Sequence, residues 1–362
     1  MAVSCGIVGL PNVGKSTIYS ALTAASAELG NFPFSTTEAA TAVVAVPDER
    51  LEILHRYIET DRIVPASVKV VDIPGLVTGS SQGEGMGNKF LGQIMECHAI
   101  MHVVRCFGGD RVVREGPVDP RGDIETVELE LALADLDTVR RAVERTAKKA
   151  KAVKEAREEL EVLERARAVL EEGGQLRHHD WNEKALRVLR PLFLMTLKPV
   201  LYVANVGDDD LAGEGEWAQQ VRAHAEAEGA DWLPLCGDLE LELRRMDEED
   251  RELFMSELGV TELGLGRLLR ATYHLLGLQT FFTAGPKEIR AWTIRRGDTA
   301  PKAAGEIHSD FEKKFIRAEV YSVDDLVEYG SEAAIKTAGK LRTEGKDYVM
   351  REGDVVHFLV GR

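Results

Sequence analysis

Residues 9–17 (GLPNVGKST) match the pattern G-x-x-x-x-G-K-[ST]. In such a loop several backbone N–H groups point at one spot, where the dipole of the following helix also favours negative charge. Lys15 is placed to reach the β- and γ-phosphates of a nucleotide, and the Ser16 hydroxyl is placed to bind Mg²⁺. The motif predicts a nucleoside triphosphate site that includes Asn12, Val13, Gly14, Lys15, Ser16 and Thr17.

The residues on either side of this loop fit the structure that it requires. Residues 3–8 form an apolar run of strand length, and Ile18, Ala21 and Leu22 follow the loop at helical spacing. A strand, a glycine-rich turn and a helix N-terminus are therefore expected in this order. A chance match in an ordinary turn would not supply all three.

A second motif, Asp72-Ile73-Pro74-Gly75, follows an apolar run of strand character. A carboxylate at the end of that strand is placed to hold Mg²⁺ through water, and the Gly75 N–H is placed to meet a γ-phosphate. Residues 31–37 (NFPFSTT) between the two motifs have the hydroxyls of a switch segment, and we expect Thr36 to be a further metal ligand. The predicted Mg²⁺ ligands are thus Ser16, Thr36 and Asp72.

The position after Gly75 bears on the rate of hydrolysis. Many GTPases carry a glutamine there that orients the attacking water, and this chain has Leu76, so we expect slow intrinsic turnover. The glycine-rich residues 79–87 are expected to act as the switch that responds to hydrolysis. Asn12 lies where related GTPases with a hydrophobic residue in place of the glutamine hold K⁺, which would stabilise charge between the phosphates.

Base recognition is expected at Asn205-Val206-Gly207-Asp208, which follows the apolar run 200–204. Guanine-specific proteins use N-K-x-D at this place, with the aspartate accepting hydrogen bonds from the guanine edge. Asn205 and Asp208 are kept here, but Val206 replaces the lysine. The replacement favours ATP and leaves GTP as the alternative.

The charge of the chain is acidic overall, with one basic stripe. The net charge is −16, from 45 basic and 61 acidic residues, which argues against a surface that binds nucleic acid all over. Between residues 140 and 157 only Glu144 and Glu155 accompany eight basic residues, namely Arg140, Arg141, Arg145, Lys148, Lys149, Lys151, Lys154 and Arg157. Such a stripe is either a solvated helix face or a phosphate-binding surface. Because it has no interleaved aromatic residues, the backbone of structured RNA such as ribosomal RNA fits it better than stacked single strands.

The pattern along the chain predicts an α/β protein with an inserted helical hairpin. Strand-like and helical runs alternate in residues 1–122 and return in residues 191–277, as in a parallel sheet. Residues 123–190 read as a coiled-coil-like hairpin, with leucine and valine recurring every three or four positions from Leu129. Residues 278–362 read as a small α+β domain. The four scattered cysteines and the lack of long apolar segments predict a cytoplasmic protein that does not enter a membrane, and nothing requires more than a monomer.

The motifs together resemble the Obg-like ATPases, the bacterial YchF branch of the P-loop GTPase superfamily. The resemblance extends over essentially the whole chain and rests on GLPNVGKST, NFPFST and DIPGLV, and further on residues 83–90 (GEGMGNKF), 102–107 (HVVRCF), 278–292 and 345–348. It implies a G domain, an inserted coiled-coil domain and a C-terminal TGS domain with a ubiquitin-like β-grasp fold. It also implies a preference for ATP over GTP, slow hydrolysis and association with the ribosome.

Two residues depart from the pattern of that family. The family typically has a glutamate where this chain has Asp208, a shorter carboxylate closer to the guanine-reading type, which keeps GTP open. In the loop after HVVRCF the family often has a histidine thought to assist hydrolysis, and alignment places Arg114 there. An arginine does not act as a base at neutral pH, so its role would be to stabilise transition-state charge.

The sequence is compatible with three functions. The first is an Mg²⁺-dependent nucleotide hydrolase that acts as a switch on the ribosome. The second is a binding module that turns nucleotide over negligibly, which Leu76 and Arg114 favour. The third is a small-molecule kinase, which the glycine-rich switch after Asp72 disfavours.

Overall fold

The computed structural model describes residues 3–28, 41–73, 86–108, 117–260 and 262–361. The chain forms two compact units. The first contains residues 3–24, 41–42 and the described part of residues 69–268, and the second contains residues 25–28, 43–68 and the described part of residues 269–362. None of the described helices is long and apolar enough to cross a bilayer. All four cysteines are buried, free thiols, as expected from their scattered positions.

The first unit is built on a six-stranded sheet with the order β2-β4-β1-β5-β6-β7. These strands are β2 (Thr41–Ala45), β4 (Ser67–Asp72), β1 (Ser4–Val8), β5 (Ala99–Cys106), β6 (Val200–Val206) and β7 (Asp231–Leu235). The pairs β1–β4, β1–β5, β5–β6 and β6–β7 are all parallel. Strands β1, β5 and β6 are buried along their whole length, which is why their sequences are continuous apolar runs. The predicted parallel α/β sheet is confirmed.

Helices lie between strands of this sheet, as parallel strands require: α1 (Lys15–Glu28) follows β1, α3 (Met86–Glu96) precedes β5, and α7 (Glu216–Glu228) joins β6 to β7. Helices α8 (Gly237–Leu243), α9 (Glu248–Glu257) and α10 (Gly264–Leu275) follow β7. Asn205 and Asp72 lie near the carboxyl ends of β6 and β4, and the phosphate loop follows β1. The carboxyl ends of parallel strands are where ligands bind in such sheets.

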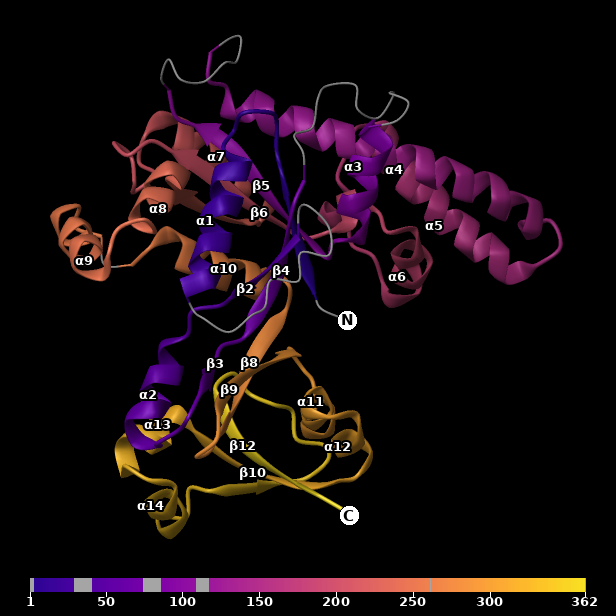
Figure 1. The fold of residues 1–362 in the computed structure, drawn as a ribbon. Helices are drawn as coiled ribbons and strands as arrows, with labels where there is room; N and C mark the ends of the chain where they lie inside the picture. The colour runs from indigo at the N-terminus through magenta and orange to yellow at the C-terminus, as the bar shows by residue number, and fades with distance from the viewer. Residues whose placement is uncertain (1–2, 29–40, 74–85, 109–116, 261, 362) are drawn as a thin grey trace. The chain divides into compact units, whose positions relative to one another are not determined.

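A long helical hairpin is inserted after β5 and consists of α4 (Pro120–Ala150) and α5 (Lys154–Glu171) (Figure 1). Asp119 caps α4 by accepting a hydrogen bond from the Gly122 N–H, and Pro120 stands at the first helical position. The predicted apolar stripe forms the hairpin core at Leu136, Val139, Val143, Leu163 and Leu170. Leu129 departs from it and is 49% exposed, because this part of α4 instead turns Ile124, Val127 and Leu131 inward.

Short helices lead from the hairpin back to the sheet. They are η1 (Leu176–His178), α6 (Glu183–Leu189), η2 (Arg190–Leu192) and η3 (Met195–Leu197). Buried Asp135 of α4 accepts hydrogen bonds from the backbone N–H groups of Met195 and Thr196 and from the Thr196 hydroxyl. These bonds fasten the returning chain to the hairpin.

The second unit has a mixed sheet with the order β11-β10-β12-β8-β9-β3. Its strands are β8 (Leu278–Ala284), β9 (Ile289–Arg295), β10 (Phe315–Ser322), β11 (Arg342–Glu344), β12 (Asp354–Val360) and the short β3 (Ile63–Val64). An antiparallel hairpin β8–β9, the helix α11 (Ala300–Ile307) and a strand β12 parallel to β8 give the expected β-grasp topology. Phe281, Ile294, Ala303, Phe315 and Phe358 contribute to its core. Shorter helices α12 (Ser309–Lys313), α13 (Val323–Tyr329) and α14 (Glu332–Thr337) complete the unit.

A segment from the N-terminal third of the chain belongs to this second unit. Helix α2 (Glu49–Tyr57) packs on α13 and β9, and Ile63 and Val64 of β3 pair with Ile289 and Arg290 of β9. This grouping differs from the expected one, in which residues 1–122 lie in the nucleotide-binding domain. A strand of two residues has no periodicity, so the sequence carried no signal for this pairing.

Candidate functional site

The phosphate loop has the backbone conformations that its glycines allow. Gly9, Asn12 and Gly14 have φ angles of 153°, 61° and 92°. A Cβ added to Gly9 would lie 2.4 Å from the Val103 carbonyl oxygen, and one added to Gly14 would lie 2.1 Å from Asn205 Nδ2. Both glycines are therefore needed for the close packing of the loop against β5 and β6.

Lys15 is buried beneath this loop, with 6% of its surface exposed. Its Nζ donates to the Leu10 carbonyl oxygen at 2.7 Å. Burial lowers the pKa of Lys15 to about 8, while the nearby Asp72 carboxylate acts in the opposite direction. A buried ammonium group held by a loop carbonyl is well placed to be stabilised by the negative charge of a polyphosphate.

Ser16 and Asp72 lie together at the start of α1 and the end of β4. The Ser16 hydroxyl donates to Asp72 Oδ2 at 3.2 Å, and Asp72 Oδ1 is buried without a hydrogen-bond partner among the described residues. Burial raises the pKa of Asp72, and the Ser16 hydrogen bond and Lys15 oppose that rise. A hydroxyl and a carboxylate with a free oxygen are the hard ligands that Mg²⁺ prefers, so these residues fit the ion. Thr36 and Gly75, the other residues predicted for this side of the site, lie outside the described residues.

Asn205 joins the phosphate loop to the loop after β7. Its Nδ2 donates to the Val13 carbonyl oxygen at 2.9 Å, and its Oδ1 accepts from the Gly237 N–H at 3.0 Å. The side chain of Val206 is 2% exposed and is buried in the sheet, whereas Asp208 is exposed in the turn that follows. The structure thus brings Asn205 to the predicted site, leaves the Asp208 carboxylate accessible there, and keeps the Val206 side chain away from solvent. Gly237 had not been predicted, because a lone glycine after a strand carries no specific signal.

Of the residues predicted to assist catalysis, Asn12 stands in the phosphate loop next to Val13. Arg114, Leu76 and the switch glycines of residues 79–85 lie outside the described residues. His308 caps α12 by accepting a hydrogen bond from the Asp310 N–H. That contact agrees with a structural role.

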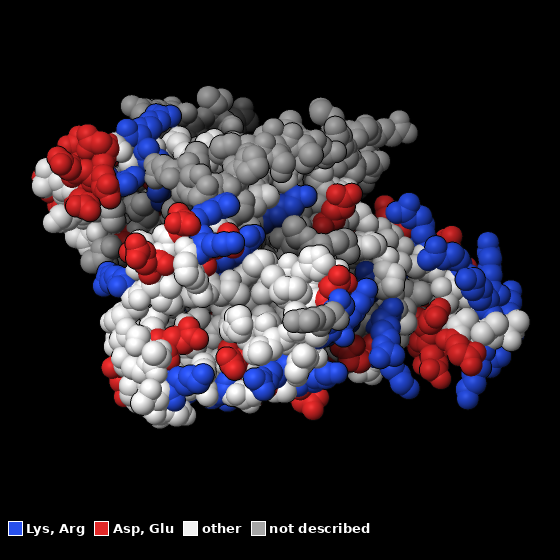
Figure 2. Space-filling model, turned by 60° about the horizontal axis from the view of Figure 1, so that its bottom comes forward, with Lys and Arg blue, Asp and Glu red and all other residues white. Residues whose placement is uncertain are grey.

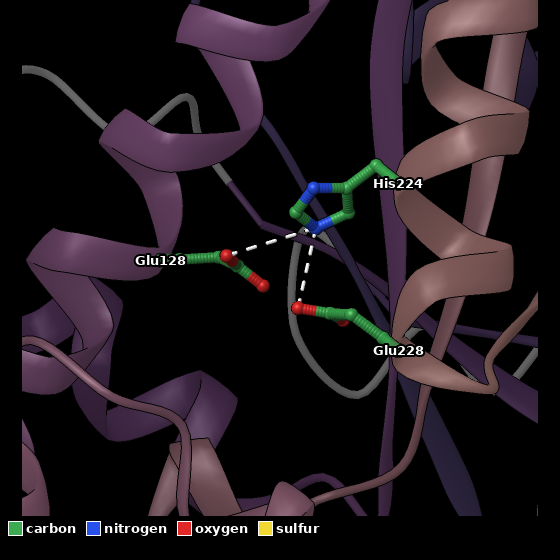
Figure 3. Close-up of side chains that lie close together, drawn as sticks. All are labelled: Glu128, His224 and Glu228. Carbon is green, nitrogen blue, oxygen red and sulfur yellow. Dashed lines mark ion pairs between the residues drawn. The ribbon is translucent and has the colours of Figure 1, made fainter.

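A charged cluster that the sequence did not reveal lies where the hairpin meets the sheet (Figure 3). Glu128 of α4, and His224 and Glu228 of α7, surround the Tyr202 hydroxyl of β6, and Arg177 of η1 lies 2.5 Å from Glu128 Oε1. The hydrogen bonds of His224 to the two glutamates raise its pKa to about 9. Burial opposes ionisation of Glu228, but its hydrogen bonds to His224 and Tyr202 and the charge of Arg177 prevail and lower its pKa to about 2. His224 and Glu228 stand four positions apart on α7, but nothing in the sequence connects them with Glu128 or Arg177.

The predicted basic stripe occupies the far end of the hairpin (Figure 2). All eight of its lysine and arginine side chains are exposed. Arg140 pairs with Glu171 at 3.2 Å, and within the described residues it is the one member of the stripe that makes an ion pair. The stripe therefore presents positive charge to solvent.

The parallel sheet, the phosphate loop and the Ser16–Asp72 pair define the class of P-loop nucleoside triphosphate hydrolases. A family profile described as "50S ribosome-binding GTPase" matches residues 4–136, and the YchF-GTPase C-terminal profile, described as a protein of unknown function, matches residues 278–361. Proteins named "Ribosome-binding ATPase YchF" from Shigella flexneri and Bacillus subtilis are 51% and 45% identical to this chain, each over 99% of both chains. The solved structure of the Schizosaccharomyces pombe YchF GTPase superimposes with a TM-score of 0.88 at 35% identity, covering 99% of this chain and 97% of that one.

The chain belongs to the YchF family. The resemblance stated from the motifs is confirmed, and so is the predicted nucleoside triphosphate hydrolase.

Proposed function

We propose that this protein is a slow, Mg²⁺-dependent ATPase of the cytoplasm whose nucleotide state controls its binding to the ribosome. The observation that carries the proposal is the Ser16–Asp72 pair beside buried Lys15, since it places candidate metal ligands next to the cation of the phosphate loop. The names of the full-length relatives support the choice of ATP and of the ribosome. Ser16, Thr36 and Asp72 would hold Mg²⁺, which supplies charge neutralisation at the β- and γ-phosphates.

The proposed preference for ATP rests on the base side of the site. A lysine in the guanine-reading motif has a long aliphatic stem, whereas Val206 is short and is buried in β6. Of the side chains in that motif, the exposed Asp208 carboxylate is then the one placed to contact a base. Since the amide of Asn205 is engaged by Val13 and Gly237, discrimination against GTP would come from the missing lysine.

Catalysis would proceed by direct attack of water on the γ-phosphate, with the loop N–H groups and Lys15 stabilising the charge that develops. Asn12 is proposed to help hold K⁺ beside the phosphates, and Arg114 is the alternative source of that positive charge. A ribosome that supplies the missing group is the third possibility. All three are consistent with Leu76 in the position of the water-orienting glutamine.

The ribosomal contact is proposed to be ribosomal RNA bound by the basic stripe. Five of its side chains, Arg145, Lys148, Lys149, Lys151 and Lys154, are exposed and make no ion pair with any described carboxylate. Cations that are not neutralised within the protein are available to phosphate groups, whose counterions are released on binding.

The test is to measure turnover of ATP and of GTP by one preparation of the full chain, with and without ribosomes, and to follow co-sedimentation with ribosomes in ATP, in ADP and without nucleotide. We expect ATP turnover that ribosomes accelerate, and sedimentation that depends on the nucleotide. GTP turnover exceeding ATP turnover would contradict the base assignment. Identical sedimentation in all three nucleotide states would contradict the switch.

A further inference from the structure

The two carboxylates of the cluster between α4 and α7 turn different oxygens to different partners. Tyr202 Oη lies 2.9 Å from Glu128 Oε1 and 2.8 Å from Glu228 Oε2, and it also lies 3.3 Å from His224 Nε2. Arg177 Nη2 lies beside the same two oxygens, at 2.5 and 3.5 Å. These contacts fix the orientation of both carboxylates.

The other oxygen of each carboxylate faces a single imidazole nitrogen (Figure 3). His224 Nε2 is 3.2 Å from Glu228 Oε1 and 3.8 Å from Glu128 Oε2, and the ligand atoms of the three residues lie within 4.8 Å of one another. Zinc binds nitrogen and carboxylate oxygen at about 2.0–2.2 Å, so two ligands of one ion lie at most about 4.4 Å apart. Both distances measured from His224 satisfy that limit.

We propose that His224, Glu228 and Glu128 form a binding site for a divalent transition metal ion, of which Zn²⁺ is the best fit, at the junction of the hairpin with the sheet. An imidazole with two carboxylates suits Zn²⁺ and its neighbours, whereas Mg²⁺ prefers oxygen ligands throughout. The three side chains keep 20%, 13% and 14% of their surface exposed, so solvent reaches each of them.

Arg177 and Tyr202 then act as outer partners of the ligands. Groups that hydrogen-bond the non-ligating oxygen of a metal-binding carboxylate fix its orientation, and their loss weakens metal binding. A metal ion and a proton would both bind His224 Nε2 and face the same two carboxylates, so they compete for this position. Because Glu128 belongs to the hairpin and the other two ligands belong to α7, a bound ion would join the two elements directly.

The experiment uses the full chain stripped of metal with EDTA and then supplied with Mg²⁺ in excess. Co²⁺ is added first, because its visible absorption reports an ordered site of low coordination number, and Zn²⁺ affinity is then measured by competition with a chromogenic chelator. We expect one ion per chain and a higher melting temperature in Zn²⁺. Glu228→Gln and Glu128→Gln should each weaken binding at least tenfold.

Two control variants locate the site. Glu226→Gln makes the same change on an exposed side chain of the same helix, which pairs with Arg222, and should leave Zn²⁺ affinity unchanged. Asp72→Asn removes a carboxylate from the nucleotide site and should also retain the ion. Circular dichroism in EDTA checks the fold of each variant.

The proposal is overturned if the wild-type chain takes up no stoichiometric Co²⁺ or Zn²⁺. The cluster would then be an ion-pair network in which protonated His224 binds the two carboxylates. It is also overturned if folded Glu228→Gln and Glu128→Gln bind as tightly as the wild type. Uptake that disappears only in Asp72→Asn would assign the ion to the nucleotide site and would equally overturn it.

Discussion

The Nδ2 group of Asn205 donates to the Val13 carbonyl oxygen at 2.9 Å, so β6 holds the phosphate loop from a distance of 192 positions along the chain. The same side chain accepts from the Gly237 N–H, and both of these contacts are buried. One amide therefore fixes two loops whose backbone groups border the predicted nucleotide site.

Asn205→Ala should weaken nucleotide binding about tenfold to a hundredfold. The change leaves the Val13 carbonyl and the Gly237 N–H without a side-chain partner, and an unsatisfied buried polar group costs about 1–3 kcal/mol. Asn205→Asp keeps the acceptor for Gly237, but it sets a carboxylate oxygen against the Val13 carbonyl oxygen and adds a buried negative charge beside the phosphate loop. Calorimetry with ATP should therefore rank the wild type first, Asn205→Ala second and Asn205→Asp last. Unchanged affinity in Asn205→Ala would show that the loop holds its shape without this contact.

The choice between ATP and GTP is tested on the wild type and on Asp208→Ala. We expect ATP to bind more tightly than GTP, because Val206 cannot take the part of the guanine-reading lysine. If calorimetry gave GTP the tighter binding by tenfold, about 1.4 kcal/mol, this expectation would be wrong and Asp208 would be the reason. In that case Asp208→Ala should abolish the preference.

The source of catalytic charge is tested by exchanging the monovalent cation. If Asn12 helps to hold K⁺, ATP turnover should be faster in K⁺ than in Na⁺, and Asn12→Ala should remove that difference. If Arg114 supplies the charge, Arg114→Ala should slow turnover equally in both salts while ATP affinity stays unchanged. Equal rates in the two salts, together with a silent Arg114→Ala, would leave the ribosome as the activator.

The basic stripe is tested by replacing Lys148, Lys149 and Lys151 with Glu. Ribosome binding should weaken, and its salt dependence should become shallower, because fewer phosphate counterions are released. Nucleotide affinity should not change. The matched control places the same charge change at exposed Lys336, Lys340 and Lys346 of the second unit. Equal loss of co-sedimentation in both triple variants would mean that net charge, and not the stripe, determines binding.

His102 should make the free energy of unfolding depend on pH. The side chain of His102 on β5 is 3% exposed, and this burial lowers its pKa to about 4. The positive charges of Arg177 and His224 lower the pKa further, and the carboxylates of Glu128 and Glu228 act in the opposite direction. Between about pH 4 and its ordinary value of about 6.5, the unfolded chain therefore binds the proton that the folded chain excludes, so stability falls as pH falls through this window. The loss amounts to about 3 kcal/mol. Urea unfolding at several pH values should show a smaller decrease for His102→Gln, and parallel curves would contradict the assignment.

The sequence predicted the parts of the site that depend on local order. Gly14, Lys15 and Ser16 follow one another along one turn, and Asp72 ends an apolar strand, so motif and strand pattern together place them. The helical hairpin and the β-grasp unit were also predicted. The contact of Tyr202 with Glu128 was not predicted, because α4 and β6 are distant in sequence and meet through tertiary packing, which no periodicity encodes.

The pairing of β3 with β9 has a consequence for the synthesis of the chain. Helix α2 and strand β3 leave the ribosome early, but the elements on which they pack, β9 and α13, lie beyond residue 269. At about 5–20 residues per second, the intervening segment takes about 10–40 s to make. Throughout that interval Leu51 and Leu54 of α2, both buried in the finished protein, lack the sheet that covers them, so the nascent chain exposes the apolar side of an otherwise charged helix. A C-terminal fragment expressed from residue 278 would face the converse problem, because β9 would then be an uncovered edge open to pairing with another chain.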